Sequence, residues 1–390
     1  MWINRDFQRY FSSISALPLK ILKGPRQVGK TSLLAQLPGY TTIFFDDLSL
    51  RQLAQDDPKT FFDQLRGPLI LDEASLAPNI FSELKRRVDA QRRSPDQIEK
   101  IDIWITGSNQ TLLQRNVQES LAGRASYFDL NTLAIHEIKN WSLQNGLLRG
   151  GWPELQIDSN LNHVRYLNDL VSTFIEKDIV AAAGIEKREA FGRSLGLIAG
   201  RVGQLVGFSD IATNVGVDTT TVQSWISLLA QNGLLRIVPA YSSNINQRLI
   251  KTPKIYFEDV ALASRLQGWN EILPLMASPS FGHLIENMAF SEVSKFFTNR
   301  GLRPEIFFIR SKEKIEIDLL IQLPNQKFIA AEIKTKAQDW SNEQIKLADS
   351  LKINIVERWI LTPQAENLNF KNTRTISFQN IWQELDRVFS

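Results

Sequence analysis

The chain has 390 residues, of which 43% are hydrophobic and 22% charged, a balance that indicates a folded globular protein rather than a disordered or fibrous one. Its length predicts two or three domains, because a single hydrophobic core stops growing at about 250 to 300 residues. The absence of cysteine excludes disulfides, thiolate zinc sites and cysteine nucleophiles. The formal net charge of +3 is too small to indicate a nucleic-acid partner by itself.

The first 15 residues mix charged with apolar side chains and lack the continuous apolar core of a secretory signal. No later run approaches the ~20 apolar residues that a membrane span needs. We therefore expect a cytoplasmic protein with no membrane partner. The three histidines, His136, His163 and His283, lie far apart in sequence, so carboxylates are the expected metal ligands.

A glycine-rich loop between a short strand and a helix is the strongest motif. Residues 19–22 predict the strand, residues 32–37 predict the helix, and the loop between them has the spacing G-x-x-x-x-G-K-T. In such a loop the amides and the helix N-terminus surround phosphates, while the lysine contacts the β and γ oxygens and the threonine hydroxyl binds Mg²⁺. A chance glycine turn is the alternative. The predicted ATP-binding residues are Gly24, Pro25, Arg26, Gln27, Val28, Gly29, Lys30, Thr31 and Ser32.

A compact apolar strand predicted at residues 68–71 ends in Asp72 and Glu73. Acidic residues at this place suit phosphoryl transfer, in which catalysis depends mainly on positioning and charge stabilisation. We expect Asp72 and Thr31 to hold Mg²⁺, Glu73 to polarise the attacking water, and Lys30 to stabilise the transferred group. A solvated acidic pair that caps the next helix is the alternative.

Two further features follow the strand predicted at residues 103–106. Ser108 or Asn109 could sense the γ-phosphate, because ligands of α/β sheets collect at the carboxyl ends of the strands. A helix cap competes with this role. Arg124 could act as an arginine finger, within the chain or towards a neighbouring subunit, and the alternative is a surface arginine paired with an acid. The finger hypothesis predicts a homo-oligomer that forms when nucleotide is bound.

These motifs resemble those of bacterial AAA-type ATPases that carry a C-terminal domain of unknown function with nuclease-like motifs, and the resemblance covers nearly the whole chain. It rests on GPRQVGKTSLL, LILDEASLAP, WITGSNQTLL, LAGRASYFDL, GGWPE at residues 150–154 and FIEKDI at residues 174–179. The last two segments show no evident chemistry, and we expect them to shape a lid behind the nucleotide. Residues 130–133 depart from the family pattern, because they lack the proline usual before the lid. The resemblance implies an α/β fold with a P-loop AAA-type core at residues 1–135 and a helical lid at residues 136–190.

Residues 191–250 have the pattern of a winged helix-turn-helix. Residues 208–222 predict a short helix, a glycine turn and the start of a second helix, and residues 234–238 predict a strand. DNA binding is one hypothesis, but the second helix, residues 219–232, contains no lysine or arginine, and phosphate contacts normally supply most of the affinity. Packing or subunit contact is the alternative. The basic residues that follow could track a DNA backbone or form a solvated face: Arg236, Arg248, Lys251 and Lys254.

The last unit, residues 251–390, begins with a linker and then predicts the order helix, three strands, helix, strand. Two of these strands lie at residues 315–321 and 328–334, and the second carries Glu332 and Lys334 on one face. Two carboxylates and a lysine on adjacent strands can hold Mg²⁺ or Mn²⁺ and orient a hydroxide against a phosphodiester. This order and motif resemble the restriction-endonuclease-like fold. The resemblance implies a candidate nuclease site, with a second Mg²⁺ or Mn²⁺, at Glu286, Asp318, Glu332 and Lys334.

Two functions follow from these features, and the sequence leaves both open. In the first, ATP hydrolysis controls a metal-dependent nuclease that acts on DNA. In the second, the protein is a nucleotide-controlled switch or scaffold whose winged-helix and inactive nuclease-like domains bind protein partners. Glu332 and Lys334 would then form a same-face ion pair beside Asp318, in a domain that has the fold without the activity.

Overall fold

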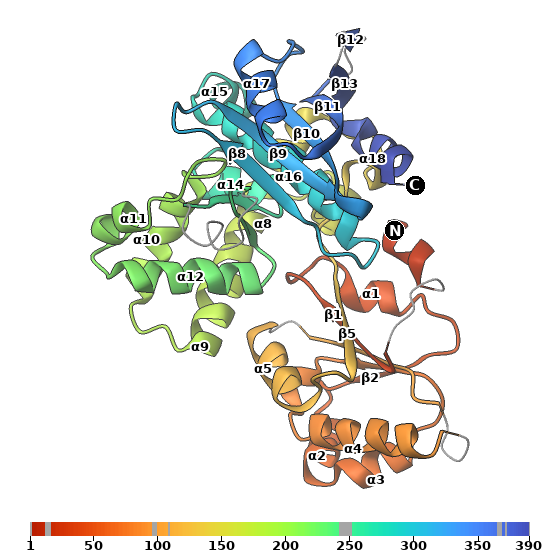
Figure 1. Ribbon diagram of the computed structural model, residues 1–390. Coiled ribbons are helices and arrows are strands. Elements are labelled where there is room, and N and C mark those ends of the chain that lie inside the picture. Colours follow the sequence, from red (N-terminus) through yellow and green to blue (C-terminus); the bar gives the residue numbers. More distant parts are fainter. Residues whose placement is uncertain are drawn as a thin grey trace.

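The computed structural model describes residues 2–11, 17–95, 100–107, 110–241, 252–364, 369–370 and 373–389. Within these ranges, a five-stranded sheet lies near the N-terminus and a six-stranded sheet near the C-terminus, with a largely helical region between them in sequence (Figure 1). Ser108 and Asn109, the expected γ-phosphate sensors, lie outside the described residues, as do Arg248 and Lys251. No helix in the described part combines the length and the apolar character that crossing a bilayer requires.

The N-terminal sheet is parallel and has the strand order β2-β3-β4-β1-β5. All residues of β3 and β4 are buried, because central strands of a parallel sheet are covered on both faces. The strands predicted at residues 19–22, 68–71 and 103–106 are confirmed to within one residue. The strands are β1 (Leu19–Lys23), β2 (Thr41–Phe44), β3 (Leu69–Asp72), β4 (Ile103–Thr106) and β5 (Ala125–Asp129).

Alternate residues of each strand face two different hydrophobic clusters. Ile70 and Trp104 pack in the cluster that contains α1, whereas Leu71 and Ile105 pack in the cluster that contains α4. This sheet therefore separates two layers of helices, and its carboxyl edge opens between them. The helical elements of this part are η1 (Asp6–Tyr10), α1 (Lys30–Leu34), α2 (Leu48–Asp56), α3 (Pro58–Asp63), η2 (Ala74–Leu76), α4 (Ile80–Arg93) and α5 (Gln110–Ser120).

The middle of the chain is helical, as the apolar spacing predicts. A left-handed Gly216 with φ +73° joins α11 to α12, which is the turn expected between these two helices. The helical elements here are η3 (Ile135–Glu137), α6 (Leu143–Leu148), α7 (Pro153–Ile157), α8 (His163–Leu170), the π-helix η4 (Val171–Ile179), α9 (Val180–Ala183), α10 (Arg188–Ala199), α11 (Phe208–Val215) and α12 (Thr219–Gln231).

An antiparallel strand pair follows α12. Strand β6 (Leu235–Val238) pairs with β7 (Lys254–Phe257), and every residue of β7 is buried. These paired strands lie on opposite sides of the boundary expected between residues 250 and 251, and that boundary stays a prediction. Helices α14 (Val260–Leu266) and α15 (Ile272–Met276) follow β7. Two helices and a strand pair in this order are typical of a winged helix, and that identity stays a prediction.

The C-terminal sheet has the order β12-β13-β11-β10-β9-β8. The pairs β8–β9 and β9–β10 are antiparallel, whereas β10–β11 and β11–β13 are parallel. The short edge strand β12 runs antiparallel to β13. This confirms the expected element order and adds β12, β13 and α18 after it. The elements are α16 (Ser280–Thr298), β8 (Ile306–Arg310), β9 (Glu316–Leu323), η5 (Pro324–Gln326), β10 (Lys327–Ile333), α17 (Asn342–Ser350), β11 (Asn354–Thr362), β12 (Asn369–Phe370), β13 (Thr373–Ser377), η6 (Phe378–Asn380) and α18 (Ile381–Phe389).

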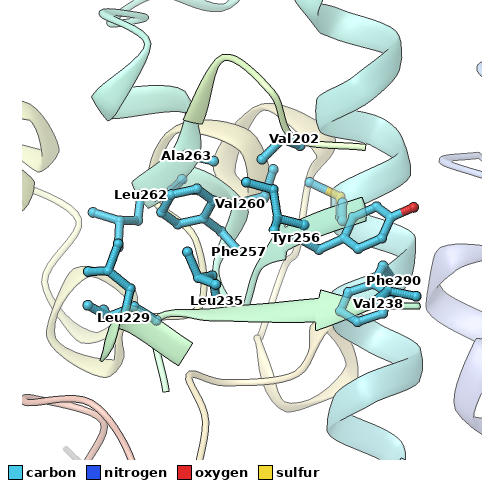
Figure 2. Close-up of a cluster of buried hydrophobic side chains, with 14 of the residues drawn as sticks. Val202, Leu229, Leu235, Val238, Tyr256, Phe257, Val260, Leu262, Ala263 and Phe290 are labelled. Atoms are coloured by element: carbon cyan, nitrogen blue, oxygen red, sulfur yellow. The ribbon is translucent and has the colours of Figure 1, made fainter. Parts of the chain in front are cut away.

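Helix α16 joins the middle of the chain to the C-terminal sheet. All residues from Leu284 to Thr298 are buried, so the helix is covered on every side over four turns. The ring of Tyr256 on β7 stacks on Phe290 of α16 with centroids 4.3 Å apart and planes 13° apart. Figure 2 shows this pair beside Val238, at the end of a continuous apolar cluster formed by β6, β7 and α14.

Two adjacent glycines explain the GGWPE segment. Gly150 is left-handed with φ +64°, and a Cβ there would lie 2.1 Å from Oδ1 of Asp259. The amide of Gly151 donates to Oδ2 of Asp259 over 2.8 Å. A Cβ on Gly151 would lie 2.2 Å from the carbonyl oxygen of Leu133. The segment therefore joins the chain after β5 to the start of α14, at a distance that only glycine allows.

We expect Gly151→Ala to lower the free energy of unfolding by about 2–3 kcal/mol, because the added methyl meets a backbone carbonyl that cannot turn aside. Chemical denaturation measures the change. Gly282→Ala is the matched control, since a Cβ at this helical glycine has no atom within 4 Å. The control should be neutral or stabilising by up to about 1 kcal/mol, and equal effects of the two variants would contradict the contact.

Candidate functional site

The glycine-rich loop follows β1 and is shaped by two left-handed or strained glycines. Gly24 has φ +145°, and a Cβ there would lie 2.0 Å from the carbonyl oxygen of Leu130, so the chain leaving β5 crosses directly over it. Gly29 has φ +89° and precedes the first residue of α1. The loop thus turns back onto a helix N-terminus, the arrangement that presents amides to an anion.

A cavity of about 620 Å³ lies at the carboxyl edge of the N-terminal sheet. Most of the predicted ATP-binding residues line it, together with the acidic pair after β3. Gly24, Pro25 and Val28 are not in its wall: Leu130 crosses over Gly24, Val28 is buried, and Pro25 lies next to Gly233. The lining residues are Arg26, Gln27, Gly29, Lys30, Thr31, Ser32, Asp46, Asp72, Glu73, Leu76, Gly107, Leu170 and Thr173.

Lys30 is held inside the loop. Its Nζ donates to the carbonyl oxygens of Gly24, over 2.9 Å, and Pro25, over 2.7 Å. Burial lowers the pKa of Lys30 to about 8, and the nearby carboxylates of Glu73 and Asp72 oppose that change. Anionic phosphate oxygens would compete with the two neutral carbonyls for this ammonium, because charge-assisted hydrogen bonds are the stronger ones.

Thr31 and Asp72 are brought together as predicted. The hydroxyl of Thr31 lies 3.0 Å from both carboxylate oxygens of Asp72. Burial raises the pKa of Asp72, while the hydrogen bond from Thr31 lowers it. A hydroxyl and a carboxylate are the oxygen donors that Mg²⁺ prefers, with water and phosphates completing its shell. The residues present therefore fit a magnesium ion.

Glu73 follows Asp72 in a left-handed conformation with φ +52°. Non-glycine residues in this region carry strain and occur preferentially at functional sites. Its Oε2 lies 3.7 Å from the position of a Cβ on Gly107, so the carboxylate points over the end of β4. The side chain thus lies between β3 and β4, on the wall of the cavity, where the attacking water is expected.

Five lining residues are not among the site residues predicted from the sequence: Asp46, Leu76, Gly107, Leu170 and Thr173. Asp46 comes from the end of β2, and Leu170 and Thr173 come from the junction of α8 and η4. The two aspartates that follow an apolar segment are the signal that could have pointed to Asp46. Thr173 directly precedes FIEKDI, so this helical region forms part of the cavity wall.

Arg124 does not line this cavity. Its Nε and Nη2 lie 2.7 and 2.8 Å from the two carboxylate oxygens of Asp89 on α4. The geometry is that of the alternative considered for it, an arginine paired with an acid. Its role as an arginine finger towards a neighbouring subunit stays a prediction.

The C-terminal residues Asp318, Glu332 and Lys334 converge across β9 and β10. The amide of Ile333 donates to Oδ2 of Asp318 over 2.8 Å, and Oε1 of Glu332 lies 3.3 Å from the amide of Asp318. Nζ of Lys334 lies 2.8 Å from Oε2 of Glu332. The expected same-face ion pair is present. Burial and the charge of Asp318 raise the pKa of Glu332 to about 8.

A second lysine, Lys254 on β7, enters the same cluster. Only 1% of it is exposed, which contradicts both the DNA-backbone and the solvated-face expectations for it. Its Nζ lies 2.8 Å from Oε1 of Glu286 and also pairs with Glu316. Oε1 of Glu286 further accepts the hydroxyl of Tyr256 over 2.5 Å. Burial opposes the charge, but the carboxylates of Glu286, Asp318 and Glu316 raise the pKa of Lys254.

The ammonium group of Lys254 therefore already serves as the counter-ion of Glu286 and Glu316. In the described part of the chain, no group of three acidic or imidazole side chains is placed to hold a metal ion. The second Mg²⁺ or Mn²⁺ expected from the resemblance stays a prediction. Burial and the charge of Asp318 raise the pKa of Glu286 to about 7.

Three family models match successive parts of the chain. Residues 17–139 match the model described as "AAA domain", residues 140–272 match "Domain of unknown function (DUF8612)", and residues 281–381 match "Domain of unknown function (DUF4143)". Together with the loop geometry, the first match supports a P-loop ATPase class and nucleotide binding for the N-terminal part. The model for residues 281–381 describes no nuclease.

Two proteins are similar in sequence along most of this chain. The uncharacterized protein Rv2008c of Mycobacterium tuberculosis is 26% identical over 316 residues, which cover 80% of this chain and 69% of that one. The uncharacterized protein MJ1544 of Methanocaldococcus jannaschii is 22% identical, over 91% of this chain and 84% of that one. Among solved structures, the Walker-type ATPase PABY2304 of Pyrococcus abyssi has a TM-score of 0.41 at 16% identity, over 68% of this chain and 96% of that one.

We expect Lys30→Ala to weaken binding of Mg²⁺-ATP by about 10- to 100-fold, because it removes a charge-assisted contact to the terminal phosphates. Nucleotide titration of the folded variant measures this. Lys85→Ala, an exposed lysine on α4, is the control and should bind as the wild type does. An undiminished affinity in Lys30→Ala would remove the P-loop assignment.

We expect Lys254→Met to destabilise the protein by about 3–5 kcal/mol, because it leaves buried carboxylates without their cation. The double variant Lys254→Met/Glu286→Gln should lose less unfolding free energy than the sum of the losses of the two single variants, because the amide of glutamine needs no counter-charge. Denaturant unfolding of the four proteins of this cycle gives the coupling. Purely additive effects would show that Lys254 and Glu286 do not depend on each other.

Proposed function

We propose that the chain binds and hydrolyses Mg²⁺-ATP and acts as a nucleotide-controlled switch, in which the state of the P-loop sets the position of the middle and C-terminal parts. The observation that carries this proposal is the close approach of the turn after α12 to the loop, together with the hydrogen bond from this turn to the start of α5. ATP hydrolysis drives the change between the two nucleotide states, and the resulting movement of that turn transmits the change to the middle part.

The chemistry at the P-loop divides among four residues. Lys30 neutralises the terminal phosphates, and Thr31 with Asp72 would hold Mg²⁺, which supplies charge stabilisation when bound. Glu73, over the end of β4, orients and polarises the water that attacks the γ-phosphorus. A carboxylate is suited to this role because phosphoryl transfer depends on positioning more than on strong base catalysis.

The turn after α12 contacts both sides of this site. A Cβ on Gly233 would lie 3.2 Å from Cδ of Pro25, so the turn rests on the loop itself. Asn232 is 1% exposed, and its Nδ2 donates to Oγ1 of Thr111 over 3.0 Å. Thr111 lies in the first turn of α5, directly after the segment that follows β4. A movement of the P-loop or of the start of α5 on binding the γ-phosphate would therefore be transmitted to α12 through this turn.

A second contact holds the loop from behind. Nη1 of Arg5 donates to the carbonyl of Val28 over 2.8 Å, and Nη2 donates to that of Asn131 over 2.8 Å. Nδ2 of Asn131 in turn donates to Oγ1 of Thr298 on α16 over 3.1 Å. The P-loop backbone is thus connected to the C-terminal part by two consecutive buried hydrogen-bonding residues.

A nuclease controlled by ATP is the second candidate. It is supported by the convergence of Asp318, Glu332 and Lys334 at the junction of antiparallel and parallel strands. It is opposed by the ammonium of Lys254, which takes the place of a metal among the acids. Protein partners are favoured over DNA for the middle part, because α12 carries no basic side chain.

Cleavage assays decide between the two candidates. The switch predicts no Mg²⁺- or Mn²⁺-dependent cleavage of supercoiled, linear or single-stranded DNA or of RNA, with or without ATP. Cleavage that disappears in Asp318→Ala and in Lys334→Ala would replace the switch by the nuclease.

We expect Glu73→Gln to keep Mg²⁺-ATP affinity within about threefold and to slow hydrolysis by at least about 100-fold, because the amide keeps the shape and loses the charge that activates water. Single-turnover hydrolysis and nucleotide titration measure the two effects separately. An unchanged single-turnover rate would move the catalytic role to another acid.

The switch itself is tested at the turn after α12. In the wild type, Mg²⁺-ATP should change amide hydrogen exchange in α12, and Asn232→Ala should suppress this change while ATP still binds, because the link to Thr111 is lost. Asn214→Ala is the control, since Nδ2 of this exposed residue donates to Asp210 within α11. If amide hydrogen exchange in α12 of the wild type is the same with and without Mg²⁺-ATP, the switch is contradicted.

A further inference from the structure

We propose that Asp46 is a further functional residue of the ATP site, where it accepts hydrogen bonds from the water shell of the bound Mg²⁺, next to Asp72. The proposal rests on the proposed function, because it assigns a role within the same site. It follows from the position of Asp46 on the sheet, from the absence of a hydrogen-bond or ion-pair partner for its carboxylate among the described residues, and from the charge of the cavity.

The register of the sheet puts Asp46 on the side of the cavity where Thr31 and Asp72 lie. Strand β2 pairs in parallel with β3, with Phe44 opposite Asp72, and the amide of Phe45 donates to the carbonyl of Asp72 over 3.1 Å. Asp46 is the next residue, and it lines the cavity together with Thr31 and Asp72. The ends of β2 and β3 therefore place Asp46 and Asp72 at the same edge of the sheet.

The neighbouring aspartate shows what a purely structural acid does here. Oδ1 of Asp47 accepts the amides of Ser49, over 2.8 Å, and Leu50, over 3.2 Å, and thereby caps α2. Asp46 is exposed, and within the described residues its carboxylate takes part in no hydrogen bond or ion pair. Two adjacent acids therefore have different roles, and the cap needs only the second.

The charge of the cavity favours a divalent cation near Asp46. Its wall carries three acids, Asp46, Asp72 and Glu73, against two basic residues, Arg26 and Lys30. ATP adds further negative charge to the same space. Like charges at close range repel one another, and a divalent cation between them turns the repulsion into attraction.

The strand order separates the role of Asp46 from that of Glu73. Strand β3 lies between β2 and β4, and Glu73 extends over Gly107 at the end of β4, whereas Asp46 ends β2 on the other side of Asp72. Mg²⁺ keeps several waters and binds few carboxylates directly. Thr31 and Asp72 would provide the direct ligands, and Asp46 would then hold outer waters of the metal rather than the attacking water.

The test uses Asp46→Asn, with Asp47→Asn as the matched control, and measures binding of a fluorescent ATP analogue in EDTA and across a Mg²⁺ titration. In Asp46→Asn the Mg²⁺ concentration for half-maximal effect should rise by about 10-fold, as for other outer-shell ligands. Metal-free binding should be equal or tighter, because one negative charge is gone. Asp47→Asn should leave both quantities unchanged.

Asp46→Ser serves as a second variant and should reproduce the shift. An unchanged Mg²⁺ midpoint, or an equal loss with and without metal, overturns the proposal. A hydrolysis rate that falls about 100-fold at saturating Mg²⁺ with an unchanged midpoint also overturns it, because Asp46 would then act on water rather than on metal. If the wild type binds no ATP, the proposed function itself is wrong. Failure of that function can therefore be distinguished from failure of the role proposed for Asp46.

Discussion

Buried polar side chains along α16 set the relative positions of the other parts of the chain. Asn287 donates to the carbonyl of Phe257 over 2.8 Å and accepts its amide over 2.6 Å, which fixes β7. On the next turns, Glu292 accepts the amide of Ile135 over 2.8 Å, and Lys295 donates to the carbonyl of Leu133 over 2.9 Å. A buried polar group that loses its partner costs about 1–3 kcal/mol, so each of these bonds favours one arrangement over its alternatives. The segment after β5, which crosses Gly24 of the P-loop, is held by this helix.

Local patterns in the sequence were sufficient for the P-loop and for the central strands. The loop, β1, β3 and β4 could be predicted because the apolar runs are short, the glycine spacing is specific and the acids follow directly. Thr31 and Asp72 do lie within hydrogen-bond distance. Asp46 could have been found in the same way, because parallel strands end at one edge, but the position of β2 in the strand order is a tertiary property.

Contacts between distant segments were not predictable from the same patterns. Strand β7 reads as part of a linker, because its partner β6 ends 16 residues earlier, across residues whose pattern gives no hairpin signal. Lys254 looked like a surface cation, since nothing near it in sequence indicates the carboxylates of Glu286 and Glu316. Gly150 and Gly151 looked like a motif without chemistry, because the close approaches that require them come from Asp259 and Leu133.

The pairing of Lys254 with Glu286 also limits how this architecture can be recombined. The third matched family region begins at residue 281, which leaves the lysine on one side of the boundary and the carboxylate on the other. A C-terminal part exchanged between relatives at that point would bring its acids into a new protein without their counter-ion, unless the recipient's β7 offered a cation at the same depth. The strand and the sheet it serves are therefore expected to be inherited together, and an exchange that works would have to cut before β7 rather than after α15.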